Sequence, residues 1–192
     1  MEIKNKHHFK MDYICCYVDL QGFYVNNMFY PRECGLLSDH GASILSVDHG
    51  LKMDQLSAND QRQVKYITRH HHGLPFTTKQ GTSIEKIKDV IMAFYEANAD
   101  EDHFLAACKT KETETVLKSL GIPRINLTPL GATWSAISTR LEPCHLHVNP
   151  GKCSLNAVIG LSKWAEKGPR EDRGDDVCGT GKTGNFQTNP FT

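Results

Sequence analysis

Four short stretches near the N-terminus have the apolar composition or alternation expected of β-strands. They are residues 14–19, 23–30, 32–38 and 43–48. The pair Gln21-Gly22 is typical of a turn after the first stretch, and Pro31 predicts a break between the second and the third. Because residues 43–48 alternate between polar and apolar, we expect them to form the third strand of a meander.

Further along the chain, apolar residues recur at the three- and four-residue intervals of a helix with one buried face. Ser57 is suited to cap a helix that runs to residue 69, and Thr82 with Glu85 forms a capping box for a second helix. Residues 103–108 predict a buried strand, followed by a third helix that begins near Lys111. A last helix is predicted from its apolar positions, Leu155, Val158, Leu161 and Trp164.

An initial run of strands followed by alternating helices and strands predicts an α/β domain with a mixed sheet flanked by helices. An antiparallel meander is expected on one side of the sheet and parallel strands on the other. We predict an N-terminal tail at residues 1–11 and the folded domain at residues 12–167. Residues 168–192 contain few apolar side chains and are predicted to be a disordered tail.

The overall charge of the chain narrows the classes of partner. Lys and Arg number 22, as do Asp and Glu, so no global basic field of the kind seen in duplex-DNA binders is expected. No apolar run approaches the roughly 18 residues that span a bilayer, and the first residues lack a hydrophobic signal core. The seven cysteines suit a reducing compartment. We therefore expect an intracellular protein, cytoplasmic or nuclear, with no membrane partner.

The most distinctive motif lies at residues 144–153, which read C-H-L-H-V-N-P-G-K-C. Cys144, His147 and Cys153 are three of the four ligands that a tetrahedral zinc takes, and the Pro-Gly pair would turn the chain between them. His145 adjoins Cys144 and is an alternative to His147, although the C-x2-H spacing favours His147. The fourth ligand must come from elsewhere in the chain.

Several segments resemble the DEDDh 3′–5′ exonucleases, which have an RNase H-like fold. The run Y-V-D-L-Q at residues 17–21 stands where those enzymes carry their first D-x-E motif. The H-G-L at residues 72–74 and the A-C-K at residues 107–109 are similar to two further segments. These enzymes hold two divalent metals with four carboxylates. Only Asp19 matches cleanly, and Gln21 replaces the glutamate, so conventional two-metal exonuclease activity is not expected.

The same departures resemble the Maelstrom domain, a germline small-RNA-pathway module with a DEDDh-like fold that has lost most of its carboxylates. That family carries a Glu-His-His-Cys-His-Cys signature, which this chain has in order as Glu33, His71, His72, Cys144, His147 and Cys153. The V-D-L-Q-G-F at residues 18–23 and the H-H-G-L at residues 71–74 are also similar to short uncharacterised insect proteins. The resemblance implies a structural zinc held by Glu33, Cys144, His147 and Cys153.

The two adjacent histidines have alternative roles. His71 and His72 are candidate metal ligands in place of Glu33, and they are also candidates for hydrogen bonding or packing beside the site. With Asp19, they are the candidates for a catalytic residue.

The resemblance implies binding of single-stranded RNA, with cleavage that does not depend on the exonuclease carboxylates. Aromatic residues that could stack on bases are Tyr24, Phe29 and Tyr30. Basic residues that could contact phosphates are Lys109, Lys111, Arg124, Arg140 and Lys152. The alternative is a catalytically inactive pseudo-nuclease that serves as a scaffold for a protein partner. A basic cleft over Asp19 would favour RNA, whereas an apolar patch would favour a protein.

Overall fold

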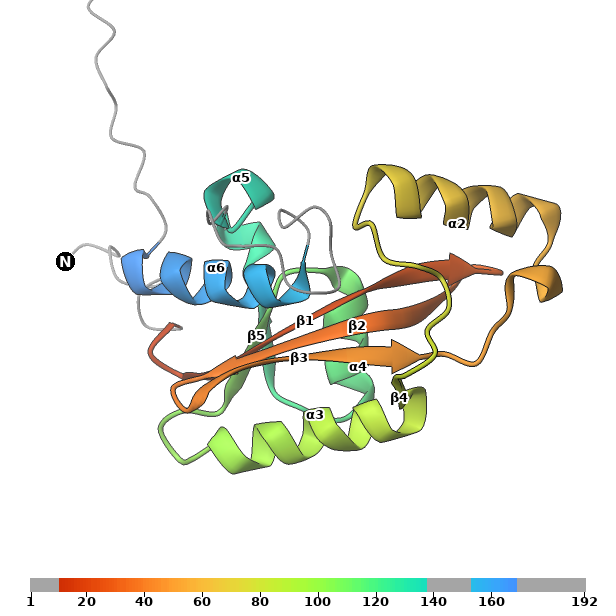
Figure 1. The fold of residues 1–192 in the computed structure, drawn as a ribbon. Coiled ribbons are helices and arrows are strands. Elements are labelled where there is room, and N and C mark those ends of the chain that lie inside the picture. The colour runs from red at the N-terminus through yellow and green to blue at the C-terminus, as the bar shows by residue number, and fades with distance from the viewer. Residues whose placement is uncertain (1–10, 138–152, 169–192) are drawn as a thin grey trace, which may run out of the picture.

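A mixed sheet of six strands, with helices on both faces, is the centre of the computed structural model, which describes residues 11–137 and 153–168 (Figure 1). The strand order is β4-β3-β2-β1-β5-β6. The first three strands form an antiparallel meander, and β5 and β6 run parallel to β1. The strands are β1 (Ile14–Val25), β2 (Met28–Ser38), β3 (Gly41–Asp48), β4 (Thr82–Ser83), β5 (Leu105–Cys108) and β6 (Arg124–Asn126). The prediction of an α/β fold with a mixed sheet flanked by helices is confirmed.

Two helical layers cover the sheet. Helices α3 (Ile84–Asn98) and α4 (Lys111–Ser119) pack on one face, and α2 (Ala58–His70), α5 (Trp134–Ile137) and α6 (Ser154–Lys167) pack on the other (Figure 1). Short 3-10 turns follow β3 and β6, η1 (Met53–Gln55) and η2 (Thr128–Leu130). No helix in the described ranges is long and apolar enough to cross a bilayer.

The first hairpin differs from the prediction. The chain does not turn at Gln21-Gly22 but continues as β1 to Val25, so the strand predicted at residues 23–30 is divided between β1 and β2. The turn lies at Asn26 and Asn27, whose φ angles are 49° and 62°. Two consecutive residues with positive φ are typical of the type I′ turn, and Asn tolerates that conformation better than most residues.

The predicted strand break at Pro31 is also wrong, because Pro31 lies within β2 at a β-bulge. Gln21 pairs with Glu33 and Gly22 pairs with Pro31, which leaves Arg32 as the extra residue. A bulge tolerates a proline because the ladder is already interrupted there. The Arg32 side chain is 3% exposed and donates hydrogen bonds to the carbonyl of Pro75 and the hydroxyl of Ser46. It therefore fastens β2 to β3 and to the loop after α2.

Helix boundaries agree closely with the sequence. Ser57 caps α2 as predicted, accepting a hydrogen bond from the Asp60 amide. The cap of α3 is Ser83 rather than Thr82, which lies in β4.

Except for Met11 and Gly168, the two predicted tails lie outside the described residues. The same holds for five candidate site residues: Arg140, Cys144, His145, His147 and Lys152.

Strand alternation decides which residues of β1 meet which helical layer. Cys16, Val18 and Leu20 belong to the core under α3 and α4. Tyr17 packs in the core under α5 and α6. Asp19 lies two residues after Tyr17 in β1, so its side chain points to the same face of the sheet, the face covered by α6.

Candidate functional site

A groove of about 340 Å³ lies where β1 and β5 separate. The last pair between these strands is Tyr17 with Ala107, so one edge of β1 is uncovered beyond it. Two side chains complete that edge: the hydroxyl of Thr113 accepts from the Leu20 amide at 3.0 Å, and His72 Nε2 lies 3.0 Å from the Gly22 carbonyl. In α/β sheets, ligands bind outside the carboxyl ends of parallel strands at such a divergence.

Aromatic and polar side chains share the groove. The rings of Tyr24 and Phe29 lie 5.6 Å apart, and the Tyr24 hydroxyl donates to Glu112 at 2.6 Å. Removal of water from around the Tyr24 hydroxyl, and to a smaller extent its hydrogen bond to Glu112, raises the pKa of Tyr24 to about 12. The residues lining the groove are Leu20, Gln21, Gly22, Tyr24, Phe29, Ile67, His71, His72, Thr110 and Glu112. The arrangement offers an aromatic surface with polar side chains beside it.

The structure assigns the adjacent histidines different environments. His72 is 3% exposed, and its Nδ1 accepts from the Leu74 amide at 3.1 Å. Nε2 must therefore carry the proton that is donated to the Gly22 carbonyl, which makes this a neutral imidazole joining the α2–β4 loop to β1. With both nitrogens bonded, His72 in this conformation has no lone pair for a metal. His71 is exposed, ends α2 and lines the groove.

Asp19 lies in a closed polar cluster and does not line the groove. Its side chain is 0% exposed, and one carboxylate oxygen accepts from the Gln21 amide at 2.9 Å. Burial raises the pKa of Asp19 to about 7, although Gln21 and Lys109 act in the opposite direction.

Lys109 is 8% exposed, and its ammonium lies 4.1 Å from the centroid of the Trp134 ring. Burial lowers the pKa of Lys109, against the attraction of Asp19. An ammonium and an amide therefore accompany the one carboxylate that matches the exonuclease motif.

The amino end of α6 lies against β2. Glu33 is 0% exposed, and its carboxylate accepts from the Ser154 amide at 2.7 Å. Gly35 permits this approach, because a β-carbon there would lie 2.5 Å from the carbonyl of Ser154. Cys153, also 0% exposed, directly precedes Ser154. A carboxylate at this position satisfies an amide of the first helical turn and interacts favourably with the helix dipole.

The contact brings together two of the predicted zinc ligands, Glu33 and Cys153, from opposite ends of the domain. Both are buried, and they would supply one oxygen and one sulfur donor, a combination that suits zinc. Cys144 and His147, with the alternative His145, lie outside the described residues. In residues 11–137 and 153–168, no group of three or more His, Cys, Asp or Glu side chains is arranged to hold a metal.

The predicted phosphate contacts are dispersed. Lys109 is buried against Trp134, whereas Lys111 is exposed at the start of α4. Arg124 is half-buried on β6, where it approaches the carbonyl of Ile122. Sequence reasoning missed Thr110 and Glu112 as parts of the groove. It also missed the cations of α2, whose helical spacing was visible in the sequence.

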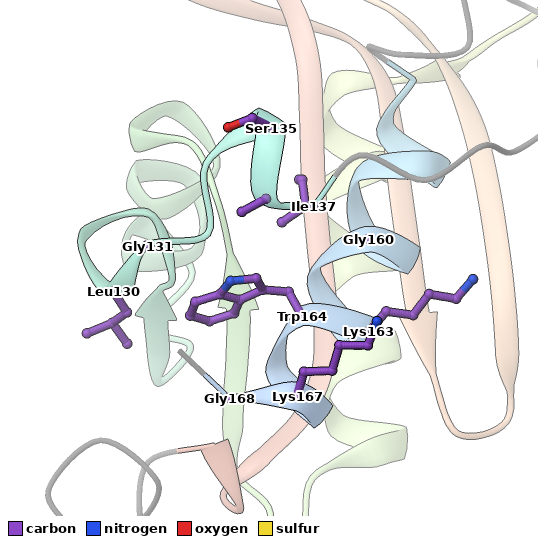
Figure 2. A pocket seen from close by; sticks show the side chains of 10 residues that line it. Leu130, Gly131, Ser135, Ile137, Gly160, Lys163, Trp164, Lys167 and Gly168 are labelled. Atoms are coloured by element: carbon purple, nitrogen blue, oxygen red, sulfur yellow. The ribbon is translucent and has the colours of Figure 1, made fainter. Parts of the chain in front are cut away.

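A second hollow, of about 460 Å³, lies between α5 and α6. The ring of Trp164 lies at its floor, and Ser135 and Ile137 come from α5 (Figure 2). Figure 2 shows that Lys163 and Lys167 extend from α6 away from that ring. Both lysines line the hollow but do not approach its aromatic ring, which makes the hollow a weaker candidate than the groove beside β1.

No protein-family model matches the chain, and no curated protein matches it. The function is therefore argued from the geometry of the groove and of the buried cluster at Asp19.

Proposed function

We propose that this chain is a single-stranded RNA-binding protein on a degenerate DEDDh exonuclease fold, an RNase H-like architecture, stabilised by a structural zinc. The strand order supports this assignment. The run β3-β2-β1-β5-β6, with an antiparallel meander followed by two parallel strands, is the order expected of that fold. The edge strand β4 is a two-residue addition.

The observation that carries the proposal is the buried state of Asp19 beside an open groove. Two-metal hydrolysis needs several carboxylates that hold metal ions against a substrate phosphate. Here Gln21 and Lys109 accompany Asp19. From the first turn of α4, Thr113 accepts from the Leu20 amide of β1, and Glu112 accepts from the Tyr24 hydroxyl. Gln21 stands where the exonuclease motif has its second carboxylate, so the proposed activity does not use two divalent ions.

The groove supports single-stranded nucleic acid as the ligand. The Tyr24–Phe29 pair offers ring surface to unstacked bases, which a duplex keeps inside its own stack. If RNA is cleaved as well as bound, His71 and Glu112 are the candidates for acid–base catalysis in the groove, because both side chains line it. The pKa of Tyr24 is raised to about 12, and both ring nitrogens of His72 are hydrogen-bonded.

The second candidate is a catalytically inactive pseudo-nuclease scaffold. What favours it is the exposure of two large apolar side chains, Met28 at 62% and Tyr66 at 57%. Such side chains suit a protein partner as well as a base.

Fluorescence anisotropy with labelled single-stranded and duplex RNA of equal length, with and without Mg²⁺, tests the proposal. We expect the single strand to bind more tightly, with no requirement for Mg²⁺. Asp19→Ala should retain binding, and any cleavage should persist in EDTA while circular dichroism shows that the protein remains folded. Absence of RNA binding would favour the scaffold, and cleavage abolished both by EDTA and by Asp19→Ala would restore a two-metal mechanism.

A further inference from the structure

The outer face of α2 is the most cationic helical surface in the described part of the chain. Arg62, Lys65 and Arg69 are exposed at intervals of three and four residues, so they lie on one side of the helix. Tyr66 projects among them and is 57% exposed. The single acidic residue of α2, Asp60, is buried and bonded to Ser57 at the helix start.

Within the described part of the chain, these cations form no ion pairs. No salt bridge joins Arg62, Lys65 or Arg69 to another described residue, since the one ion pair in these ranges is between Asp100 and His103. The whole chain has no net charge, so this face is a local concentration and not part of a general basic field. An anionic polymer would therefore be drawn to this helix in preference to the rest of the described surface.

The basic face continues into the groove. Ile67, His71 and His72, at and just after the carboxyl end of α2, form one wall of the groove. From Arg62 to His71 the helix rises about 14 Å, which is enough for a short run of nucleotides. The ring of Tyr66 lies 4.8 Å from that of His70 and 5.6 Å from that of His71, so flat side chains line this path.

Charge also determines the orientation of a strand on this surface. Glu112, on the opposite wall of the groove, would repel phosphates. The Tyr24–Phe29 pair, also in the groove, would accept bases. The phosphates are therefore best placed along α2, with the bases directed toward β1.

Other ligands fit this surface less well. A basic amphipathic helix that binds membranes inserts its apolar face into lipid. The apolar face of α2 is already buried, with Val64 2% exposed in the core beside Phe23 and Leu56. A duplex would satisfy the cations but would leave Tyr66 and the groove without unstacked bases.

We propose that single-stranded RNA lies along the outer face of α2, with its phosphates on Arg62, Lys65 and Arg69 and a base on Tyr66, and enters the groove beside β1 at His71. This inference rests on the proposed RNA-binding function, and it names the binding surface of that function.

The test compares two variants of the full chain, using a labelled oligouridine of about 12 nucleotides. In Arg62→Gln/Lys65→Gln/Arg69→Gln, affinity should fall at least tenfold. The slope of log affinity against log salt should decrease by about 2, since each single-strand phosphate contact contributes roughly 0.7. Tyr66→Ala should weaken binding about tenfold with the salt slope unchanged, because stacking does not release counterions.

A matched control removes the same charge from the other side of the molecule. Lys86, Lys88 and Lys118 are exposed on α3 and α4, across the sheet from α2 (Figure 1). The triple change to Gln at these positions should alter affinity less than twofold. All these side chains are exposed, so thermal melting should match that of the unmodified protein.

The possible results are distinguishable. Equal affinity of the α2 triple variant and the unmodified protein would overturn the α2 surface and leave the RNA-binding function intact. An equal loss in the control triple would also overturn it, by showing that net charge alone matters. Failure of the unmodified protein to bind the oligouridine would overturn the proposed function and this inference together.

Discussion

Glu33 can act as the cap of α6, as a zinc ligand, or as both, and the substitution Glu33→Gln separates these roles. Glutamine keeps an oxygen that can accept from the Ser154 amide, now 2.7 Å from the carboxylate, but removes the charge. A buried charge at a helix start contributes about 2 kcal/mol at most, and a charged hydrogen bond exceeds a neutral one by roughly 1 kcal/mol. As a cap alone, Glu33→Gln should therefore lower the free energy of unfolding by about 2–3 kcal/mol.

If Glu33 is a zinc ligand, the substitution should lower the free energy of unfolding more than the loss of a helix cap would. Structural zinc sites contribute roughly 10–16 kcal/mol of apparent binding free energy, and that energy is coupled to folding. A neutral amide is a poor zinc ligand, so Glu33→Gln should release the metal and lower stability by well over 3 kcal/mol. Because we propose the zinc site, we expect this larger loss, with about one zinc per chain in the unmodified protein and none in the variant.

The assay combines metal analysis of undenatured protein with urea unfolding followed by tryptophan fluorescence, each with and without a chelator. In chelator, the difference between the two proteins should shrink to the 2–3 kcal/mol of the cap. Glu96→Gln, an exposed position on α3, should leave both readings unchanged. If Glu33→Gln retains its zinc, Glu33 is not a ligand. If the unmodified protein contains none, the structural-zinc reasoning is refuted.

Three further outcomes can be measured by urea unfolding. Burial raises the pKa of Asp19 from 3.8 to about 7. Between pH 3.8 and about pH 7, the native state therefore holds a proton that the unfolded chain has lost. The free energy of unfolding should fall as the pH rises through that range. Asp19→Asn should remove this dependence on pH, so that from pH 5 to pH 8 the free energy of unfolding of the variant rises by up to about 3 kcal/mol relative to that of the unmodified protein. Parallel pH profiles of the two proteins would contradict the raised pKa. Gly35→Ala places a β-carbon 2.5 Å from the Ser154 carbonyl and should cost about 1–3 kcal/mol, whereas a change under about 0.5 kcal/mol would mean that α6 is not seated so closely. Cys153→Ser should destabilise the domain more than Cys15→Ser, since Cys153 is fully buried and Cys15 only partly; equal losses of unfolding free energy would remove the special role of Cys153.

Local features of the fold could be predicted where a few neighbouring residues decide them. The cap of α2 at Ser57 follows from a hydroxyl three residues before a free amide, and the stripe of α3 follows from spacing that brings Ile87 and Ile91 to one side. The first hairpin could not be predicted in this way. Gln21-Gly22 has turn composition, but pairing with β2 extends β1 through it, and the bulge at Arg32 accommodates Pro31.

For the candidate site, too, local features could be predicted from the sequence and contacts between distant segments could not. The residue types were evident in the sequence: a Cys-His-Cys run, a glutamate on an early strand, a histidine pair and one surviving aspartate. Their separations in space were not, since the bond between Glu33 and the Ser154 amide joins positions 121 residues apart. Nor could local spacing show that Lys109 is buried beside Asp19 and Trp134 instead of facing a ligand.

By itself, the sequence determined the fold class, most helix boundaries and the set of side chains available for chemistry, because periodicity and capping act within one or two turns of chain. Only the tertiary structure decided which of those side chains are enclosed and which are exposed. Sheet pairing buried Asp19 under α6, bonded His72 to β1, and left His71 and the cations of α2 on the surface. That difference arises because burial depends on contacts between distant segments, and the desolvation it brings changes what a charged group can do.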